Sequence, residues 1–594
     1  MSLPIVLLAA AFAASPAAPD RALRALLDEA WQFDLREDPL GATFVGDHRY
    51  DDRLPSMTHG DLDRRAAYWR GALTRLHGID RGRLAAGDRV NYDMFQRHVE
   101  DTLAEHEFGV WRQPIDADSG FHTAVAMLAS QLDLATTRDY ESYIARLRAL
   151  PAYFGQQTAL LRDGLRAGFT VPRVVLQGYD AGIRAHVVDD PEKSVFWGPF
   201  RSFPAGVPEA DRERLRGQGR AAIREGAVPA YRALLDFMVG EYIPGARTTI
   251  AAGDLPRGRE YYAHLVESFT TLHVTPEEVH RTGTAEVERI RSEMTAVMRS
   301  TGFTGGFAAF LEMLRTDPRF YAKTPEELLQ RASFIAKKMD GKLPSLFGRL
   351  PRLPYGVEPV PAEIAPKYTG GRYVAAPVGG TRAGTYWVNT YALESRPLYT
   401  LESLTLHEAV PGHHLQIALQ QEMEGVPEFR RHAGVTAFVE GWGLYAERLG
   451  LEAGFYQDPY SNFGRLTYEM WRACRLVVDT GMHALGWTRE RAMEFLAANT
   501  ALSRHEIETE TDRYIAWPGQ ALAYKMGELK IRALRAQAER ELGAGFDIRR
   551  FHDAVLANGP VPLAVLEDQI RGYIASARAP AGAGHRGGQA GERR

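Results

Sequence analysis

The sequence predicts a mainly α-helical protein with one small β-sheet. Apolar residues recur at helical spacing through most of the chain. The stripe formed by Leu23, Leu26, Leu27 and Ala30 is an example, and such a stripe is more often core packing than a binding surface. We expect the main helical regions at residues 21–104, 123–134, 139–167, 212–240 and 275–298.

The predicted sheet lies between residues 341 and 389. Seven prolines in this segment exclude a long helix. Residues 372–376 and 384–390 alternate polar and apolar side chains as strands do, with Gly379-Gly380 between them as the expected turn. An exposed edge of this sheet could pair with an extended peptide, or the sheet could simply cover the core.

We predict a single large catalytic domain over residues 19–576. The chain of 594 residues shows no repeat of fixed period and no segment with the composition of an interdomain linker. Residues 577–594 are poor in large apolar side chains and rich in Gly, Ala and Arg, so we expect a disordered tail.

The first 18 residues have the pattern of a signal peptide. A short apolar run is followed by small residues that suit cleavage, although no Lys or Arg precedes the run. The run is too short to span a membrane, and no other segment qualifies as a span. We therefore expect an exported protein, periplasmic or extracellular, without stable membrane insertion.

Composition excludes some classes of partner and site. The net charge is −4, the isoelectric point is near 6.5, and Lys and Arg are scattered, so we expect no nucleic-acid partner. Cys474 is the single cysteine, which excludes a disulfide framework, and its apolar neighbours predict a buried, unreactive thiol. The sequence gives no indication of the oligomeric state.

Residues 401–420 hold the densest group of candidate metal ligands. His407-Glu408 begins like the zinc-peptidase pattern H-E-x-x-H, which places two histidines one helical turn apart. The fourth residue after His407 is Pro411, however, and the next histidines are His413 and His414. The ordinary pattern therefore fails.

Pro411-Gly412 offers a solution, because proline and glycine together favour a bulge or break in the helix. In an unbroken helix, His414 would lie about 10.5 Å along the axis from His407, too far to share a metal ion. Two looped-out residues would bring His413 to the place of the second ligand. Three looped-out residues would bring His414 there instead.

A third ligand is expected from a second helix. Residues 415–424 and 433–449 read as two helices around a turn at residues 425–427. In an antiparallel hairpin, Glu440 comes level with His413, and Glu447 comes level with His407. The glycines on either side of Trp442 would permit close helix approach beside Glu440, so we prefer Glu440 as the ligand.

Glu408 is placed to act as a general base. It follows His407 directly, so it can face a metal-bound water without binding the metal. A substrate carbonyl that gains negative charge would need a further donor, for which we select Tyr514 and His483.

Other downstream residues have expected roles at the substrate. Arg513 could hold a substrate carboxylate, and Asn389 and Tyr524 are further candidates for substrate binding. Arg475, Asp479 and His483 recur every four residues, and a salt bridge between the first two is more plausible than direct catalysis.

Several segments together resemble the DUF885 family of bacterial proteins, which are similar to zincin metallopeptidases. The central ones are HEAVPGHHLQ and AFVEGWGLYAERL, and the later ones are RLVVDTGMHALGW and DRYIAWPGQALAYKMG. Segments near the N-terminus resemble the family as well, so the likeness covers nearly the whole mature chain. It implies a mostly helical, zincin-like hydrolase fold with His407, His413 and Glu440 as zinc ligands. It implies nothing about the substrate.

The leading functional hypothesis is a zinc-dependent hydrolase of amide bonds, acting on peptides. One alternative is hydrolysis of a small non-peptide amide at the same Zn²⁺. Another is an exported peptide-binding protein without turnover. Glu408 favours catalysis, because a structural zinc needs no base beside its ligand and is usually closed by four ligands.

Overall fold

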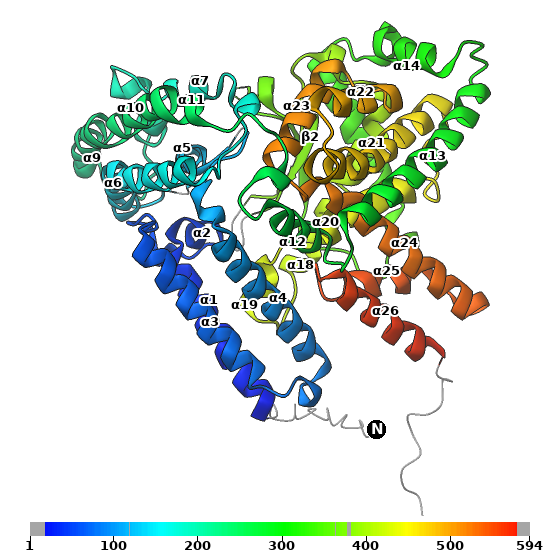
Figure 1. The fold of residues 1–594 in the computed structure, drawn as a ribbon, viewed down its shortest axis with the longest axis horizontal. Helices are drawn as coiled ribbons and strands as arrows, with labels where there is room; N and C mark the ends of the chain where they lie inside the picture. The colour runs from blue at the N-terminus through cyan, green and yellow to red at the C-terminus, as the bar shows by residue number, and fades with distance from the viewer. Residues whose placement is uncertain (1–17, 118, 133, 363, 377–381, 579–594) are drawn as a thin grey trace, which may run out of the picture.

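The structure, a computed structural model, describes residues 18–117, 119–132, 134–362, 364–376 and 382–578. It is mainly helical with one three-stranded sheet, as the sequence predicts (Figure 1). The expected Gly379-Gly380 turn lies outside the described residues, as do nearly all of the predicted signal peptide and tail.

The N-terminal helices form a bundle with its own apolar core. Three of them run side by side at the lower left of Figure 1, and Leu23, Leu27, Trp69 and Phe95 are among the buried residues between them. The helices are α1 (Ala18–Glu37), α2 (Pro39–Phe44), α3 (His59–His77) and α4 (Ala86–Phe108).

A second group of helices lies above this bundle in Figure 1. Two π-helical stretches, residues 223–227 and 238–242, join three of the helices into one continuous segment, which confirms the helix expected at residues 212–240. The group comprises α5 (Phe121–Gln131), α6 (Thr137–Ala167), α7 (Tyr179–Arg184), α8 (Gly198–Arg201), α9 (Glu209–Ala222), α10 (Val228–Phe237) and α11 (Ile243–Gly245).

The sheet has the strand order β1-β3-β2. The two predicted strands are β2 (Gly371–Val374) and β3 (Gly384–Val388), and they pair antiparallel, with Tyr373 opposite Tyr386. The sequence did not reveal β1 (Tyr355–Pro359), which pairs parallel with β3. Proline is tolerated in β1 because a strand at the sheet edge leaves some N–H positions unpaired.

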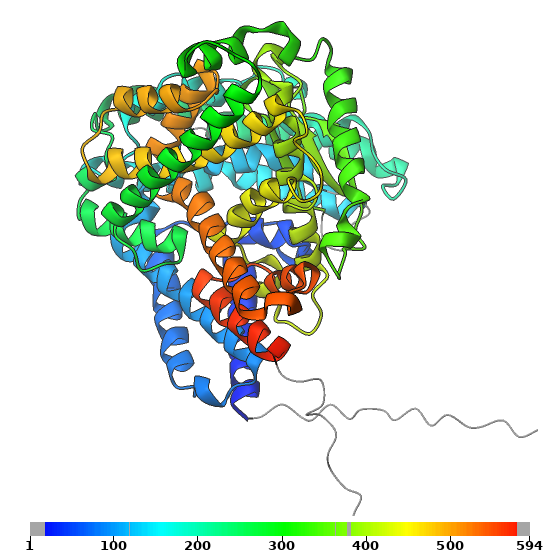
Figure 2. The same ribbon diagram turned by 90° about the vertical axis from the view of Figure 1, so that its right-hand side faces the viewer.

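The remaining helices surround the sheet and build the largest part of the molecule (Figures 1 and 2). Helix α13 packs along α21, and α20 packs along α24. The remaining helices are α12 (Gly258–Thr270), α13 (Pro276–Ser300), α14 (Phe307–Thr316), α15 (Pro325–Asp340), α16 (Leu343–Leu346), α17 (Leu401–Glu408), α18 (His413–Gln421), α19 (Glu428–His432), α20 (Thr436–Leu449), α21 (Pro459–Ala484), α22 (Arg489–Asn499), α23 (Arg504–Ala516), α24 (Ala523–Leu542), α25 (Ile548–Leu556) and α26 (Leu563–Arg578).

Glycines permit the closest of these helix contacts. A Cβ atom added to Gly441 of α20 would lie 2.6 Å from the Cα atom of Gly527 in α24. Side chains at these positions would force the two helices apart, so the small residues expected beside Trp442 do allow close approach.

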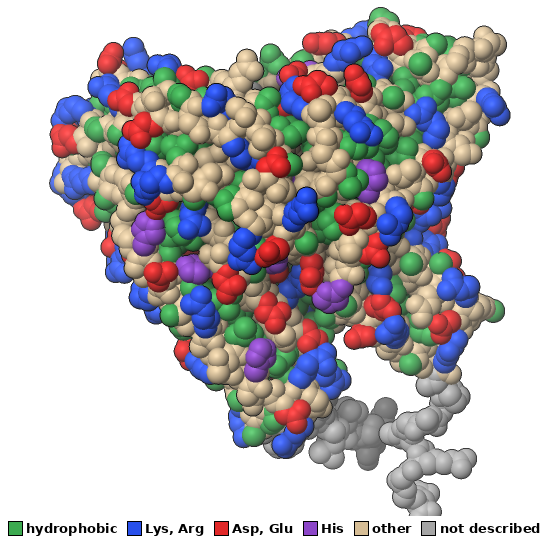
Figure 3. All heavy atoms as spheres, viewed as in Figure 1, with side chains coloured by type: hydrophobic (Ala, Val, Ile, Leu, Met, Phe, Trp, Pro, Cys, Tyr) green, Lys and Arg blue, Asp and Glu red, His purple; other side chains and the backbone are tan. Residues whose placement is uncertain are grey.

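The mixed charge of the surface and the burial of the single cysteine are as the sequence predicts. Acidic and basic side chains are interspersed over the face shown in Figure 3. Cys474 is buried in α21, and burial raises the pKa of its thiol, as expected for an unreactive cysteine. Within the described ranges, every helix is too short or too polar to cross a membrane.

Candidate metal centre

The helix that carries His407 breaks where the sequence predicts. Helix α17 ends at Glu408, and α18 begins at His413. Across the break, the Gly412 N–H donates to the Leu406 carbonyl at 3.0 Å, and the His414 N–H donates to the Ala409 carbonyl at 3.0 Å. Glycine is required at the break, because a Cβ atom on Gly412 would lie 1.9 Å from the His407 carbonyl oxygen.

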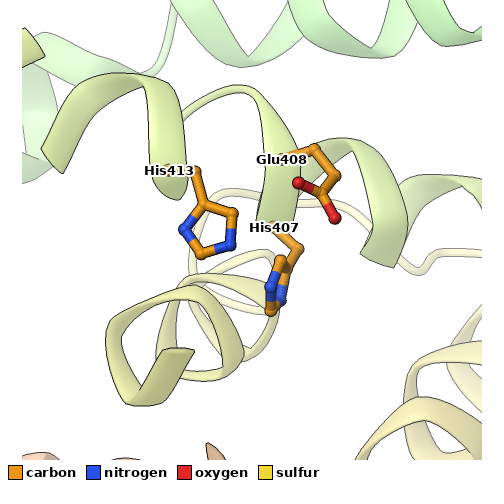
Figure 4. A group of neighbouring side chains, drawn as sticks. All are labelled: His407, Glu408 and His413. Atoms are coloured by element: carbon orange, nitrogen blue, oxygen red, sulfur yellow. The ribbon is translucent and has the colours of Figure 1, made fainter. Parts of the chain in front are cut away.

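The break brings His413 beside His407. Their ring centroids are 4.6 Å apart, and the ring planes are nearly perpendicular at 87° (Figure 4). Two imidazoles that approach in this way can direct one nitrogen each toward a common point. This is the arrangement that looping out two residues was expected to produce.

Glu440 of α20 is the third side chain that approaches the same point. Its Oε2 atom lies 3.3 Å from Nε2 of His407 and 3.5 Å from Nε2 of His413. In a tetrahedral zinc site, Zn–N and Zn–O bonds of about 2.0–2.2 Å separate neighbouring ligand atoms by roughly 3.3–3.5 Å. The two distances from Glu440 therefore match those between neighbouring ligand atoms in a tetrahedral zinc site.

Glycine again makes this geometry possible. A Cβ atom on Gly443 would lie 2.6 Å from Cε1 of His407, so a larger residue there would displace the imidazole. Trp442 fixes the same region, because its indole N–H donates to the Pro411 carbonyl at 2.9 Å. Helix α20 is thus held directly against the break between α17 and α18.

Glu408 lies beside the two histidines. Ligand atoms of His407, Glu408 and His413 all fall within 4.8 Å of one another (Figure 4). The carboxylates of Glu408 and Glu440 could each form a triplet with the histidines, but Oε2 of Glu408 accepts the Tyr373 backbone N–H at 2.8 Å. This bond to β2 fixes Glu408 next to the two histidines, whereas Oε2 of Glu440 lies within 3.5 Å of both.

Glu447 lies behind His407. Its Oε1 atom is 2.8 Å from Nδ1 of His407, and the Arg472 guanidinium is 3.3 Å from the same oxygen. A carboxylate in this position orients the imidazole and fixes Nε2 as the free nitrogen. Glu447 is therefore level with His407 because it is a hydrogen-bond partner of the imidazole, and it does not take the position of a ligand.

The charges of the centre are strongly coupled. Burial would lower the pKa of His407, but hydrogen bonds to Glu440 and Glu447 and the charge of Glu408 raise it to about 9. Burial would raise the pKa of Glu440, but the two histidines hold it well below its usual range. A buried carboxylate between two imidazoles favours positive charge at this point, which a metal ion would provide.

His414 points away from the centre. Its Nδ1 atom is 2.9 Å from the Tyr373 hydroxyl, and its ring packs against Tyr355. Burial lowers the pKa of His414 to about 4, so it is a neutral histidine between the sheet and α18. The longer loop that would bring His414 to the metal is not formed.

The two expected oxyanion donors are already engaged elsewhere. The Tyr514 hydroxyl donates to Glu510 at 2.7 Å and accepts from Trp471 and Arg475. Both ring nitrogens of His483 have partners, because Nδ1 accepts the Ala252 N–H and Nε2 donates to the Tyr514 carbonyl, each at 2.9 Å. Both side chains are buried and already hydrogen-bonded, and their role as oxyanion donors stays a prediction.

The polar stripe on α21 also differs from expectation. Arg475 pairs with Glu510 at 3.0 Å, and no salt bridge with Asp479 forms. Asp479 instead accepts the Tyr262 hydroxyl and the Gly519 N–H. Tertiary partners from α12 and α23 thus replace the expected contact within one helix.

Two of the expected substrate-binding residues have structural partners. Arg513 pairs with Glu510 at 2.8 Å and donates to Gln520 at 2.9 Å. The Asn389 amide donates to the carbonyls of Ala365, Tyr368 and Thr369, which fixes the loop before β2. Neither side chain is free to bind a substrate in this conformation.

Tyr524 stays a candidate for substrate binding. It is partly exposed, and burial and the charge of Glu440 raise the pKa of its phenol. The Arg475 guanidinium lies 4.3 Å from the centroid of its ring. The raised pKa keeps the phenol protonated at neutral pH, so it could donate a hydrogen bond to a substrate.

The sequence did not single out Tyr373 or Arg472. Tyr373 uses its backbone N–H on Glu408 and its hydroxyl on His414, which no side-chain pattern reveals. Arg472 is one of several buried charged residues of α21, with Arg465, Glu469, Arg475 and Asp479. A buried arginine needs an ionic partner, but α21 carries several such residues, so no pattern distinguishes Arg472.

Comparisons with known proteins agree with this fold. A family described as "Bacterial protein of unknown function (DUF885)" matches residues 39–570. The search of curated proteins gave no match.

Two solved structures have similar folds. One, of a "putative lipoprotein" from Colwellia psychrerythraea, is 28% identical with a TM-score of 0.89, and the match covers 94% of this chain and 100% of that chain. The other, of a "putative lipoprotein of unknown function" from Shewanella oneidensis, is 18% identical with a TM-score of 0.71, and the match covers 93% and 100% of the two chains.

Proposed function

The chain belongs to the DUF885 family of bacterial proteins, and we propose that it is a zinc-dependent hydrolase that cleaves amide bonds in peptides. The observation that carries this proposal is the spacing at Glu440. One carboxylate oxygen lies 3.3 Å and 3.5 Å from the Nε2 atoms of two histidines, with Glu408 beside them. This ligand set and its neighbouring base suit a zincin-like active site.

The three ligands would be His407, His413 and Glu440. Three protein ligands are the usual set of a catalytic zinc, which keeps a fourth position for water. A zinc ion held there would polarise a carbonyl group and lower the pKa of its bound water to about 7.

Glu408 would act as the general base and acid. Its carboxylate would take a proton from the water as the new C–O bond forms and would later give it to the leaving amine as the C–N bond breaks. The Tyr373 N–H holds Glu408 in orientation for both transfers. Tyr524 would donate its phenol proton in a hydrogen bond to the carbonyl oxygen as that oxygen gains charge.

The proposal includes export to the periplasm or the extracellular medium. The signal-peptide pattern of residues 1–18 supports it, and so does the name of the similar protein from Colwellia psychrerythraea. N-terminal sequencing of protein from the native host should find a start near residues 14–20. An intact Met1 on active protein would contradict export by this route.

Glu408→Gln tests the mechanism, because it keeps the side-chain size and removes the base. Cleavage of a peptide library should stop with a chelator, and the variant should be about 10²–10⁴-fold slower with unchanged zinc content. Glu424→Gln, at an exposed position after α18, is the matched control and should keep full activity.

Two outcomes would redirect the assignment. Full activity of Glu408→Gln would reject Glu408 as the base. A wild-type protein that binds zinc and peptides but cleaves none would favour the peptide-binding alternative, and cleavage of small amides alone would favour the non-peptide alternative.

A further inference from the structure

A cavity of about 70 Å³ lies next to the helix that carries His407 and Glu408. It is enclosed by α17, the end of β3, the loop before α17, and helices α21 and α23. The lining combines apolar side chains such as Leu404 with Arg396, Thr467 and Glu506. Its size suits several waters or one small polar group of a ligand.

Two polar groups in the lining lack partners. Neither Oγ1 of Thr467 nor Nε of Arg396 has a hydrogen-bond partner in the part of the chain that the structure describes. Thr467 is only 1% exposed, so the bulk solvent does not serve its hydroxyl. Buried polar groups are nearly always paired, so these two indicate a ligand that accepts hydrogen bonds.

The lining carries two arginines and two carboxylates. Arg315 and Arg396 line the cavity together with Glu394, which is exposed, and Glu506. Arg315 already pairs with Glu312 at 3.7 Å and donates to three backbone carbonyls, so among the described residues of the lining Arg396 is the cation with an unpartnered N–H. Burial raises the pKa of Glu506 to about 7, against the opposing charge of Arg396, which weakens its repulsion of a bound anion.

Two further arginines lie behind the residues that line the cavity. The charges of Arg472 and Arg475 on α21 reach Glu506, and each guanidinium has one buried nitrogen without a partner among the described residues. Arg472 pairs with Glu447 at 3.3 Å, and Arg475 pairs with Glu510 at 3.0 Å. Both arginines therefore have ionic partners, and each adds only that one unpartnered nitrogen behind the cavity.

Helix α17 and the sheet each connect the cavity to the proposed reaction centre over a short distance. Leu401, Leu404 and Glu408 follow one face of α17, and Leu404 lies about 6 Å along the axis from Glu408. In the sheet, Val388 lines the cavity and pairs with Gly371, two residues before the Tyr373 N–H that holds Glu408. One or two residues of an extended peptide would span this separation.

We propose that this cavity is a subsite that binds a carboxylate of the substrate through Arg396 and Thr467. The inference rests on the proposed peptidase function and adds a substrate class, namely peptides with a carboxylate one or two residues from the cleaved bond. Arg396 would donate charge-assisted hydrogen bonds, and the Thr467 hydroxyl would donate one more. The carboxylate could belong to an acidic side chain or to the peptide C-terminus.

Binding to the Glu408→Gln protein tests the subsite without any requirement for turnover. Calorimetry would compare a peptide carrying Glu with its Gln counterpart, and a free C-terminus with a C-terminal amide. At least one acid should bind roughly 10–100-fold more tightly than its amide, because charged hydrogen bonds are lost in the amide. The pair that shows the difference identifies the source of the carboxylate.

Variants then assign the preference to the cavity. Arg396→Gln should bring the affinities of acid and amide close together, and Thr467→Val should reduce their ratio several-fold. Arg504→Gln is the matched control, because Arg504 is exposed on the same helix as Glu506 and lies outside the lining. Zinc content and melting temperature of each variant show whether it is folded.

Two results would overturn the subsite. Equal affinities for both acid–amide pairs would show that the protein does not recognise a carboxylate. An acid preference that survives in folded Arg396→Gln would place the recognition elsewhere. Failure of the proposed function would look different, because the binding preference would persist in a protein that holds no zinc or cleaves no peptide.

Discussion

The candidate metal centre and the ion-pair cluster around Lys525 are both buried, and the close contact between α20 and α24 connects two of the helices that carry them. In the cluster, Lys525 is fully buried, and its Nζ atom lies 2.9 Å from Glu528 and 3.0 Å from both Glu286 and Glu469. Arg289 and Arg465 add positive charge to the same carboxylates.

In the candidate metal centre, no lysine or arginine among the described residues pairs with Glu440. Arg472 pairs with Glu447, but within the described residues neither Nδ1 of His413 nor Oε2 of Glu447 has a hydrogen-bond partner. Burial would lower the pKa of Lys525, but the carboxylates raise it, so its cluster carries its own counter-charge. A complete ionic cluster stabilises the fold, whereas an incomplete one is suited to bind an ion.

The largest expected effect is the loss of zinc when a ligand is removed. His407→Ala, His413→Ala and Glu440→Ala should each bind little zinc, because two ligands cannot complete the site. His414→Ala should keep its zinc, since that side chain faces Tyr373. Metal analysis of the purified variants measures this, and zinc retained by His413→Ala but lost by His414→Ala would reverse the assignment.

Lys525→Met should destabilise the fold without affecting the metal. Removing the cation leaves the three carboxylates with only arginines as counter-charge, which should lower the free energy of unfolding by about 3–5 kcal/mol. Lys337→Met, at an exposed position on α15, should change it little. Denaturant unfolding beside zinc analysis makes the comparison, and loss of zinc in folded Lys525→Met would show that the two clusters are not independent.

Two tyrosines extend the same contrast to catalysis. Tyr524→Phe should lower turnover by about 10²–10³-fold if its phenol serves the substrate oxygen. Tyr514→Phe should mainly lower stability, because the Tyr514 hydroxyl is enclosed by Glu510, Trp471 and Arg475. Steady-state kinetics and thermal melting separate the two, and the opposite pattern would favour Tyr514 as the donor.

The smallest expected effect concerns the outer partner of His407. Glu447→Gln should weaken zinc affinity by about 10–100-fold, because the carboxylate that orients the imidazole is lost. Glu452→Gln, at an exposed position just after α20, serves as the control. Competition with a chelator measures the affinity, and an unchanged affinity in Glu447→Gln would mean that Glu447 has no part in holding the ligand.

Local properties of the sequence determined the helical class, the two predicted strands β2 and β3, and the break in the helix after Glu408. Helical periodicity, strand alternation and the Pro411-Gly412 pair each act over a few residues, so they can be read directly. The pairing of Glu440 with the histidines was also accessible, because a short hairpin fixes which residues come level.

Only the tertiary structure decided the roles of the residues far along the chain. Tyr514, His483 and Arg513 carry the right chemical groups, but their partners come from Glu510, Ala252 and Gln520. The same holds for Tyr373, whose backbone N–H reaches Glu408 only because β2 packs on α17. The residue type fixes which donor groups a side chain has. Whether those donors are free depends on long-range contacts that no local pattern encodes.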